Sequence, residues 1–182
     1  MKGIVFSEFN EMVEEMFSPA LADKIIMRSD LASGGAYTTV GTYDHRELLT
    51  LVACLSEETG IAASNLVKTF GRHLAARFTA LYPAFFQGIG GTLDFLETIE
   101  QHVHVEVRKL YPDAELPTFS TERTGADSMT MVYRSRRPFA DLAEGLIEGC
   151  ASHFAERIAI ERSDSSAAGE LHSTRFTLSR ID

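Results

Sequence analysis

The chain has 182 residues, of which 45% are hydrophobic and 24% charged, as in an ordinary globular domain that can bury a core without disulfide or metal support. With 26 acidic residues against 17 Lys and Arg, its net charge is −9, which disfavours nucleic acid and anionic membrane surfaces as partners. The two cysteines form no CxxC pair, which excludes a zinc ribbon and a thioredoxin-type motif. No apolar run could span a bilayer and no secretory signal is present, so we expect a cytoplasmic protein with reduced thiols.

The first two-thirds of the chain are predicted to be helical, because apolar residues recur at a spacing of three and four. The expected helices cover Phe6–Phe17, Leu21–Met27, Glu47–Leu55 and Ala62–Tyr82. A Gly-rich bend follows. Thr92 is then expected to cap a further helix over Leu93–Tyr111, which Pro112 stops.

The last third of the chain changes character. Ser128–Ser135 alternates in the manner of a strand, and Leu142–Ile158 returns to helical spacing. Ile158–Arg162 and Ser173–Leu178 alternate like paired strands, separated by the turn-rich segment Ser163–Gly169. This order predicts an α+β fold in which an antiparallel sheet packs on helices.

Two histidines lie in the helix predicted before Pro112. The apolar stripe of that helix comprises Leu96, Ile99, Val103, Val107 and Leu110. His102 and His104 flank this stripe on opposite sides, so at most one of them reaches the buried side, and the wheel slightly favours His104. Exposed histidines are the common case, and a ligand to a metal or haem iron is the alternative. Their i, i+2 spacing prevents both from binding one ion.

A second group of polar residues follows the predicted strand. In extended backbone, Tyr133, Ser135 and Arg137 line one face. Two hydroxyls and a guanidinium form a donor array that suits one or two carboxylates. The alternative is the solvated outer face of a sheet.

Three features together resemble the haem nitric oxide/oxygen-binding family (H-NOX or HNOB), which includes the haem domain of soluble guanylate cyclase. Met1–Gly3 leads directly into an apolar helix. His104 precedes Pro112 by eight residues, as the proximal histidine of the family precedes its proline. The segment Tyr133–Arg137 is similar to the YxSxR motif of the family and is followed at family spacing by Gly145–Gly149.

The resemblance implies a single domain over residues 1–182, with a distal helical subdomain over about 1–60 and a proximal subdomain over about 61–182. It implies haem b held non-covalently between them, with His104 as the axial iron ligand. The other residues that it assigns to the haem are Tyr133, Ser135 and Arg137 at the propionates, with Pro117, Phe78 and Leu146. Some bacterial relatives carry a cysteine-rich zinc site near the C-terminus. The region Ile158–Ser173 has no cysteine, so we expect no zinc.

The predicted distal pocket is apolar. Relatives that bind O2 stably use a distal tyrosine; the aligned position here is Leu142, and a supporting polar position aligns with Leu74. Ile4, Val5 and Phe9 are expected to complete the wall. Bound O2 carries more negative charge than bound NO and gains more from a donor. A lost charge-assisted hydrogen bond costs about 1.5–3 kcal/mol, or more than tenfold in affinity. We therefore expect binding of NO and CO and exclusion of O2.

The resemblance implies a gas sensor and not an enzyme. NO is expected to weaken the bond between His104 and iron, which frees the helix to shift and the two subdomains to rotate. Because no kinase, cyclase or methyl-accepting segment precedes the end at Asp182, we expect a separate effector. Candidates are a two-component histidine kinase and a diguanylate cyclase or phosphodiesterase acting on cyclic-di-GMP.

Two alternatives differ in class from a sensor. One is a haem or metal oxidoreductase, which is disfavoured because no acid–base pair stands near Leu74 and Leu142. The other is a cofactor-free α+β domain that binds a carboxylated hydrophobic ligand through Tyr133, Ser135 and Arg137.

Overall fold

The computed structural model describes residues 1–166 and 171–181. The chain divides into two compact units, Met1–Phe70 and Gly71–Asp182, and helix α4 (Ala63–Leu81) runs through the boundary between them. The sequence placed the division near residue 60. None of the helices in the described ranges has the length and apolarity needed to cross a bilayer.

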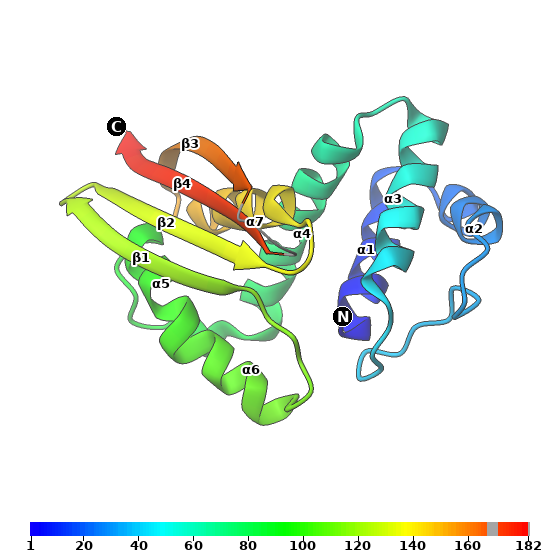
Figure 1. The fold of residues 1–182 in the computed structure, drawn as a ribbon, viewed down its shortest axis with the longest axis horizontal. Helices are drawn as coiled ribbons and strands as arrows, with labels where there is room; N and C mark the ends of the chain where they lie inside the picture. Colours follow the sequence, from blue (N-terminus) through cyan, green and yellow to red (C-terminus); the bar gives the residue numbers. More distant parts are fainter. Residues whose placement is uncertain (167–170, 182) are drawn as a thin grey trace. The chain divides into compact units, whose positions relative to one another are not determined.

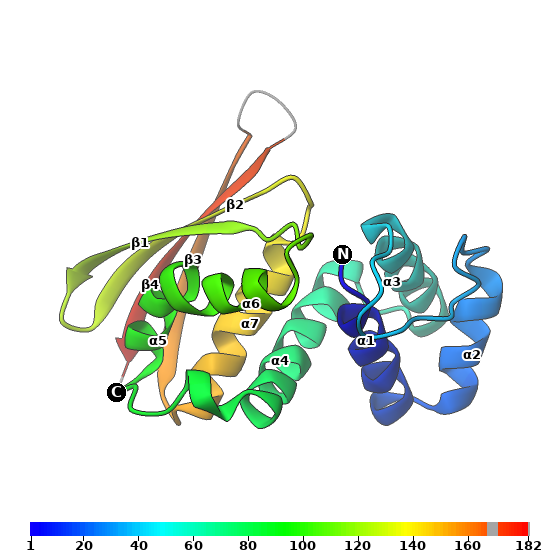
Figure 2. The same cartoon turned by 90° about the horizontal axis from the view of Figure 1, so that it is seen from below.

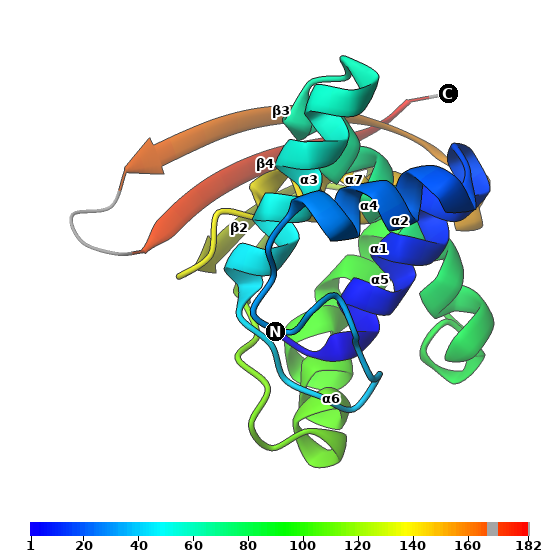
Figure 3. The same cartoon turned by 90° about the vertical axis from the view of Figure 1, so that its right-hand side faces the viewer.

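The first unit is helical. It contains α1 (Gly3–Met16), α2 (Pro19–Arg28), α3 (His45–Thr59) and the first part of α4, and Figure 3 shows α1, α2 and α3 with the N-terminus. Two of these helices begin at side-chain caps, because Ser18 accepts from the Leu21 N–H and Asp44 accepts from the Arg46 N–H. The faces that these helices bury are mainly apolar, as the helical spacing predicts, with Glu8 on α1 as a buried acid.

The second unit combines helices with a sheet. After α4 and the 3-10 turn η1 (Pro83–Phe85), its elements are α5 (Thr92–Thr98), the π-helical turn η2 (Ile99–Val103), α6 (His104–Leu110), β1 (Thr118–Gly125), β2 (Ser128–Ser135), α7 (Ala140–His153), β3 (Arg157–Ser166) and β4 (His172–Ile181). The strands pair antiparallel in the order β1-β2-β4-β3 (Figure 1).

The helices of this unit cover one face of the sheet. Figure 2 shows α5, α6 and α7 on the same side of the strands. Side chains of the central strands therefore alternate: Met129, Met131 and Tyr133 on β2 are buried, and Phe176 and Leu178 on β4 join them. The α+β architecture with an antiparallel sheet packed on helices is confirmed.

Strand β1 is absent from the sequence-based prediction. Its sequence, Thr118–Gly125, contains a single large apolar side chain, Phe119, and it forms an edge of the sheet. A half-polar edge strand lacks the hydrophobic alternation on which strand prediction depends. The ends of β3 and β4 also extend beyond the predicted ranges, so Ser163–Ser166 of the predicted turn belong to β3. Residues 167–169 of that turn lie outside the described residues.

Two helix ends differ from expectation. Thr92 is not the N-cap of α5, since Gly91 occupies that position and the Thr92 N–H donates to Glu156 Oε2 at 2.8 Å. The capping acceptor thus comes from a residue distant in sequence. Helix α7 ends at His153 instead of continuing to Ile158, because the chain turns at Ala155, whose φ is +53°.

Candidate functional site

The helix predicted over Leu93–Tyr111 is interrupted by η2 immediately before His104. The His104 N–H donates to the Ile99 carbonyl, five residues back, as in a π turn. A π turn adds a residue to one turn, so side chains beyond it rotate relative to a regular helix. This explains why His104 is only 8% exposed while Leu110, assigned to the buried stripe from the sequence, is 66% exposed. His102 lies on the exposed side.

A carboxylate holds one ring nitrogen of His104. The Nδ1 atom lies 3.0 Å from Glu100 Oε2, one helical turn earlier. Burial lowers the pKa of His104, although Glu100 acts in the opposite direction. Burial would raise the pKa of Glu100, but hydrogen bonds from Arg108, the Phe119 N–H and His104 lower it overall. The imidazole is therefore neutral and the carboxylate ionised, which assigns the proton to Nδ1 and the lone pair to Nε2.

Phe119 connects this histidine to the YxSxR segment. Its ring centroid lies 5.7 Å from that of His104 and 5.6 Å from that of Tyr133. Phe119 and Tyr133 are direct partners in the pairing of β1 with β2. The fold thus brings both His104 and Tyr133 into contact with one phenylalanine ring. Sequence reasoning missed Phe119 because it missed β1.

The predicted donor array is compact, but its geometry differs from a continuous strand. Strand β2 ends at Ser135, so Arg137 follows in a bend and not in extended backbone. The Tyr133 hydroxyl donates to the Arg137 carbonyl at 3.3 Å, and the Arg137 N–H donates to Ser135 Oγ at 3.0 Å. Burial raises the pKa of Tyr133, so its hydroxyl stays protonated as a donor.

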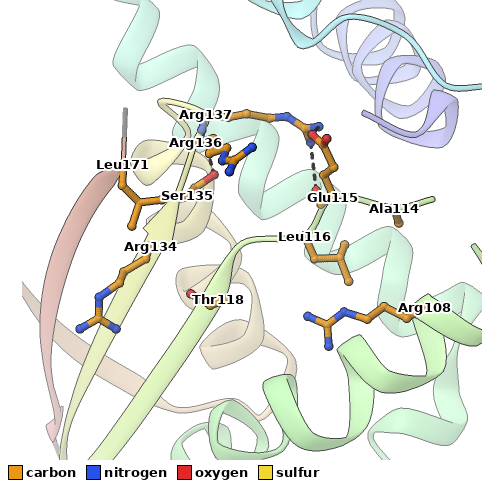
Figure 4. Close-up of a pocket in the computed structure, with 10 residues that line it drawn as sticks. All are labelled: Arg108, Ala114, Glu115, Leu116, Thr118, Arg134, Ser135, Arg136, Arg137 and Leu171. Atoms are coloured by element: carbon orange, nitrogen blue, oxygen red, sulfur yellow. Dashed lines mark hydrogen bonds and ion pairs between the residues drawn. The ribbon is translucent and has the colours of Figure 1, made fainter. Parts of the chain in front are cut away.

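The Arg137 guanidinium already holds a carboxylate. It donates to Glu115 Oε2 at 2.6 Å and to the Glu115 carbonyl at 3.1 Å (Figure 4). The Arg137 side chain is 15% exposed and that of Glu115 75% exposed. An exposed acid of this kind is easily displaced by another carboxylate, because its ion pair contributes up to about 1 kcal/mol.

An open pocket of about 360 Å³ surrounds this ion pair. Its charged lining consists of Arg108, Arg134, Arg136 and Arg137 against the single acid Glu115 (Figure 4). Among these arginines, only Arg137 pairs with Glu115, while Arg108 pairs with Glu100, so Arg134 and Arg136 give the pocket an excess of positive charge although the whole chain is acidic. The pocket therefore favours an anionic ligand group.

The remaining predicted residues are distributed over several elements. Half-buried residues of the second unit are Phe78 on α4, Pro117 before β1, and Leu142 and Leu146 on α7, while Leu74 on α4 is buried. In the first unit, Ile4 and Val5 are half-buried, and Phe9 is fully buried with its ring edge-on to Phe70 at 5.3 Å. Their predicted haem contacts stay predictions.

The donor set suits haem. A neutral imidazole with a free Nε2 lone pair is the form that ligates iron, and a guanidinium that binds a carboxylate is the form that binds a propionate. These features, on an α+β unit with an antiparallel sheet, are those expected of a haem-binding domain.

Comparisons with known proteins agree with this class. The haem-NO-binding (HNOB) family model matches residues 2–162. The chain therefore belongs to the H-NOX family, whose members are haem-binding sensor domains that bind gaseous ligands and signal to partners. The resemblance seen in the sequence is confirmed. No curated protein sequence matches the chain.

Several solved structures are similar over their whole length. The unliganded Fe(II) H-NOX protein from K. algicida is 37% identical, with a TM-score of 0.91 over 100% of this chain and 97% of that one. The H-NOX from Shewanella woodyi, in the Fe(II)CO state with IWP-051 bound, is 39% identical, with a TM-score of 0.83 and coverages of 100% and 95%. A mutant of the T. tengcongensis H-NOX, at 22% identity, a TM-score of 0.90 and coverages of 100% and 98%, shows the fold alone.

Proposed function

We propose that this chain is a haem-based sensor of NO that holds haem b non-covalently through His104 Nε2. The observation that carries the proposal is the buried, neutral imidazole whose Nδ1 is fixed by Glu100. Tyr133, Ser135 and Arg137 would hold the propionates, and Glu115 marks a carboxylate position on Arg137. We expect no bound zinc, and a reduced cytoplasmic setting remains our expectation from the sequence alone.

A bound haem would supply a ferrous iron that takes a diatomic gas. We propose that the pocket for the gas binds NO and CO and excludes O2. Leu74 and Leu142, at the aligned distal positions, have no hydroxyl or amide to donate to a partly negative ligand. Without that charge-assisted hydrogen bond, affinity for O2 is more than tenfold lower, whereas NO loses little.

The response that we propose starts at His104. If the imidazole were released from haem, it would stay hydrogen-bonded to Glu100, and α6 would be free to move. That motion would reach β1 through the Glu100 bond to the Phe119 N–H. The effector would be a separate protein, either a two-component histidine kinase or an enzyme of cyclic-di-GMP turnover. We do not propose an enzymatic reaction for the chain itself.

Absorption spectra of the haem-supplied ferrous protein test the gas selectivity. We expect the Soret band to shift with NO and with CO and to stay unchanged in air until oxidation. The variant L142Y, which adds a hydroxyl, should raise O2 affinity more than tenfold, and L142F, which adds only a ring, should not.

Three outcomes would contradict parts of the proposal. A reversible spectral change of the native protein in air would refute the exclusion of O2. Protein that stays colourless despite haem supply would favour the cofactor-free binding domain. Turnover of a substrate by the haem-loaded protein would favour the oxidoreductase.

A further inference from the structure

Glu100 accepts three hydrogen bonds, one of them from the predicted iron ligand. Its Oε2 accepts from His104 Nδ1 at 3.0 Å and from the Phe119 N–H at 3.1 Å. Its Oε1 accepts from the Arg108 guanidinium at 3.1 Å. The Glu100 side chain is 30% exposed, so it is partly withdrawn from water at the point where it meets the imidazole. One carboxylate thus joins η2, α6 and β1.

The orientation of an imidazole ligand depends on what holds its second nitrogen. An ionised carboxylate only accepts, so a neutral His104 facing it must carry its proton on Nδ1. That tautomer leaves the lone pair on Nε2, and the negative charge increases the basicity of the ring. Without the carboxylate, the imidazole could place its proton on either nitrogen and rotate about its side-chain bonds.

The same oxygen also ties the imidazole to the sheet. Phe119 is the second residue of β1 and follows Pro117 by two positions, and its ring contacts those of His104 and Tyr133. Because Oε2 is shared by the imidazole and this backbone N–H, a displacement of His104 changes a bond at the start of the strand. Arg108 holds the other carboxylate oxygen, Oε1, and so limits how far the Glu100 carboxylate can move with His104.

We propose that Glu100 is the positioning residue of the axial histidine, fixing the tautomer with the Nε2 lone pair and linking the imidazole to the start of β1. This inference rests on the proposed role of His104 as the iron ligand. The part of the inference that concerns the His104 tautomer can be tested on the haem-free protein, independently of that role.

The tautomer of His104 in the haem-free protein is the first test. Side-chain 15N shifts of the histidines should show the Nδ1–H form in the native chain. E100Q keeps a neutral acceptor and should preserve that form. E100A removes the acceptor and should give a mixture of tautomers. The control E106Q makes the same chemical change on α6 at a residue that pairs with Lys109, and should leave the His104 signals unchanged.

The haem-loaded variants are the second test. In the ferrous state, E100Q should lower the Fe–His stretching frequency, because the ring loses its charged partner, and E106Q should not. Transfer of haem to an acceptor apoprotein should be about tenfold or more faster for E100A than for the native chain. Melting curves of all variants report any loss of folding, and E100Q supplies the spectroscopic result if E100A does not fold.

The possible outcomes separate this inference from the proposed function. An unchanged tautomer in E100A, or an unchanged Fe–His frequency in E100Q, would overturn the role of Glu100 while leaving His104 as the ligand. A lower melting temperature of the Glu100 variants, with no change in the His104 tautomer or in the Fe–His frequency, would show that Glu100 has only a structural role. A native ferrous protein without any Fe–His band would instead refute His104 as the ligand.

Discussion

The ion pair between Arg137 and Glu115 places a carboxylate on the arginine that the family resemblance assigns to a propionate. The guanidinium is mostly buried, whereas the acid is mostly exposed. The arginine is therefore held in position by its surroundings, and its present partner is replaceable. Arg137 also donates to the backbone carbonyl of Glu115, a contact that does not depend on the carboxylate.

Replacing this arginine should weaken haem binding. R137Q removes the charge and the paired donors, and a charge-assisted hydrogen bond contributes about 1.5–3 kcal/mol, so we expect haem affinity to fall tenfold or more. R134Q is the matched control, since Arg134 lies in the same pocket but donates to Ser120. Haem titrations followed at the Soret band measure both variants. Equal losses in the two variants would show that only overall charge matters.

Single residues differ in how far the sequence reveals them. The helical wheel only slightly favours His104 over His102, and the family resemblance selects His104 by its distance to Pro112. Glu100 cannot be selected from the sequence, because it is one acid among many and its partner at Phe119 is brought close only by the fold. Glu115 is likewise an ordinary surface acid until the chain places it against Arg137.

At the scale of elements, α4 and α7 approach each other at glycines. A Cβ at Gly149 would lie 2.4 Å from Ala75 Cβ, and one at Gly71 would lie 2.5 Å from the Leu142 carbonyl oxygen. These distances are shorter than side-chain contacts allow. The close approach fixes α7 against the part of α4 that lies in the second unit, and so positions the helix on which the sheet rests.

Adding a methyl group at this contact should destabilise the second unit. In G149A the gain in helix propensity, about 1 kcal/mol, opposes a clash with Ala75 that cannot relax without moving a helix. We expect the free energy of unfolding to fall by about 1–3 kcal/mol in urea titrations. In the control G90A the nearest atom is the mobile Asp94 carboxylate at 3.0 Å, and the change should stay within about 0.5 kcal/mol. A stabilised G149A would contradict the packing argument.

Elements with strong hydrophobic periodicity could be predicted, and the two that shape the site could not. The π turn η2 has no signal in apolar spacing, because it arises from one extra residue accommodated inside a helix. Strand β1 has a single large apolar residue and depends on pairing with β2. Both are positioned by tertiary contacts, and together they bring Phe119 to His104.

At the scale of the whole molecule, the chain is an acidic H-NOX domain with a local basic pocket. The family could be recognised from the sequence because its motifs span most of the chain at fixed spacing. The selectivity for gases and the identity of the effector depend on groups that the motifs do not contain. These remain proposals that a response of the whole protein can test.

The proposed response predicts a difference between two gases. In that response, His104 would hold the haem, and NO but not CO would release its imidazole. We expect backbone amide exchange in α6 and at Phe119 to accelerate when the ferrous protein receives NO, and to change little with CO. Hydrogen exchange followed by mass spectrometry measures this. Identical exchange in the two complexes would show that the signal does not pass through His104.

The claim that His104 Nε2 binds haem iron is tested most directly by removing the His104 side chain and supplying free imidazole in solution to replace it. We expect H104G to lose the native ferrous absorption spectrum and to regain it when imidazole is added. H102G, which lacks the exposed histidine of the preceding turn η2, should keep the native spectrum throughout. Haem binding by H104G with an unchanged ferrous spectrum in the absence of imidazole would contradict the claim.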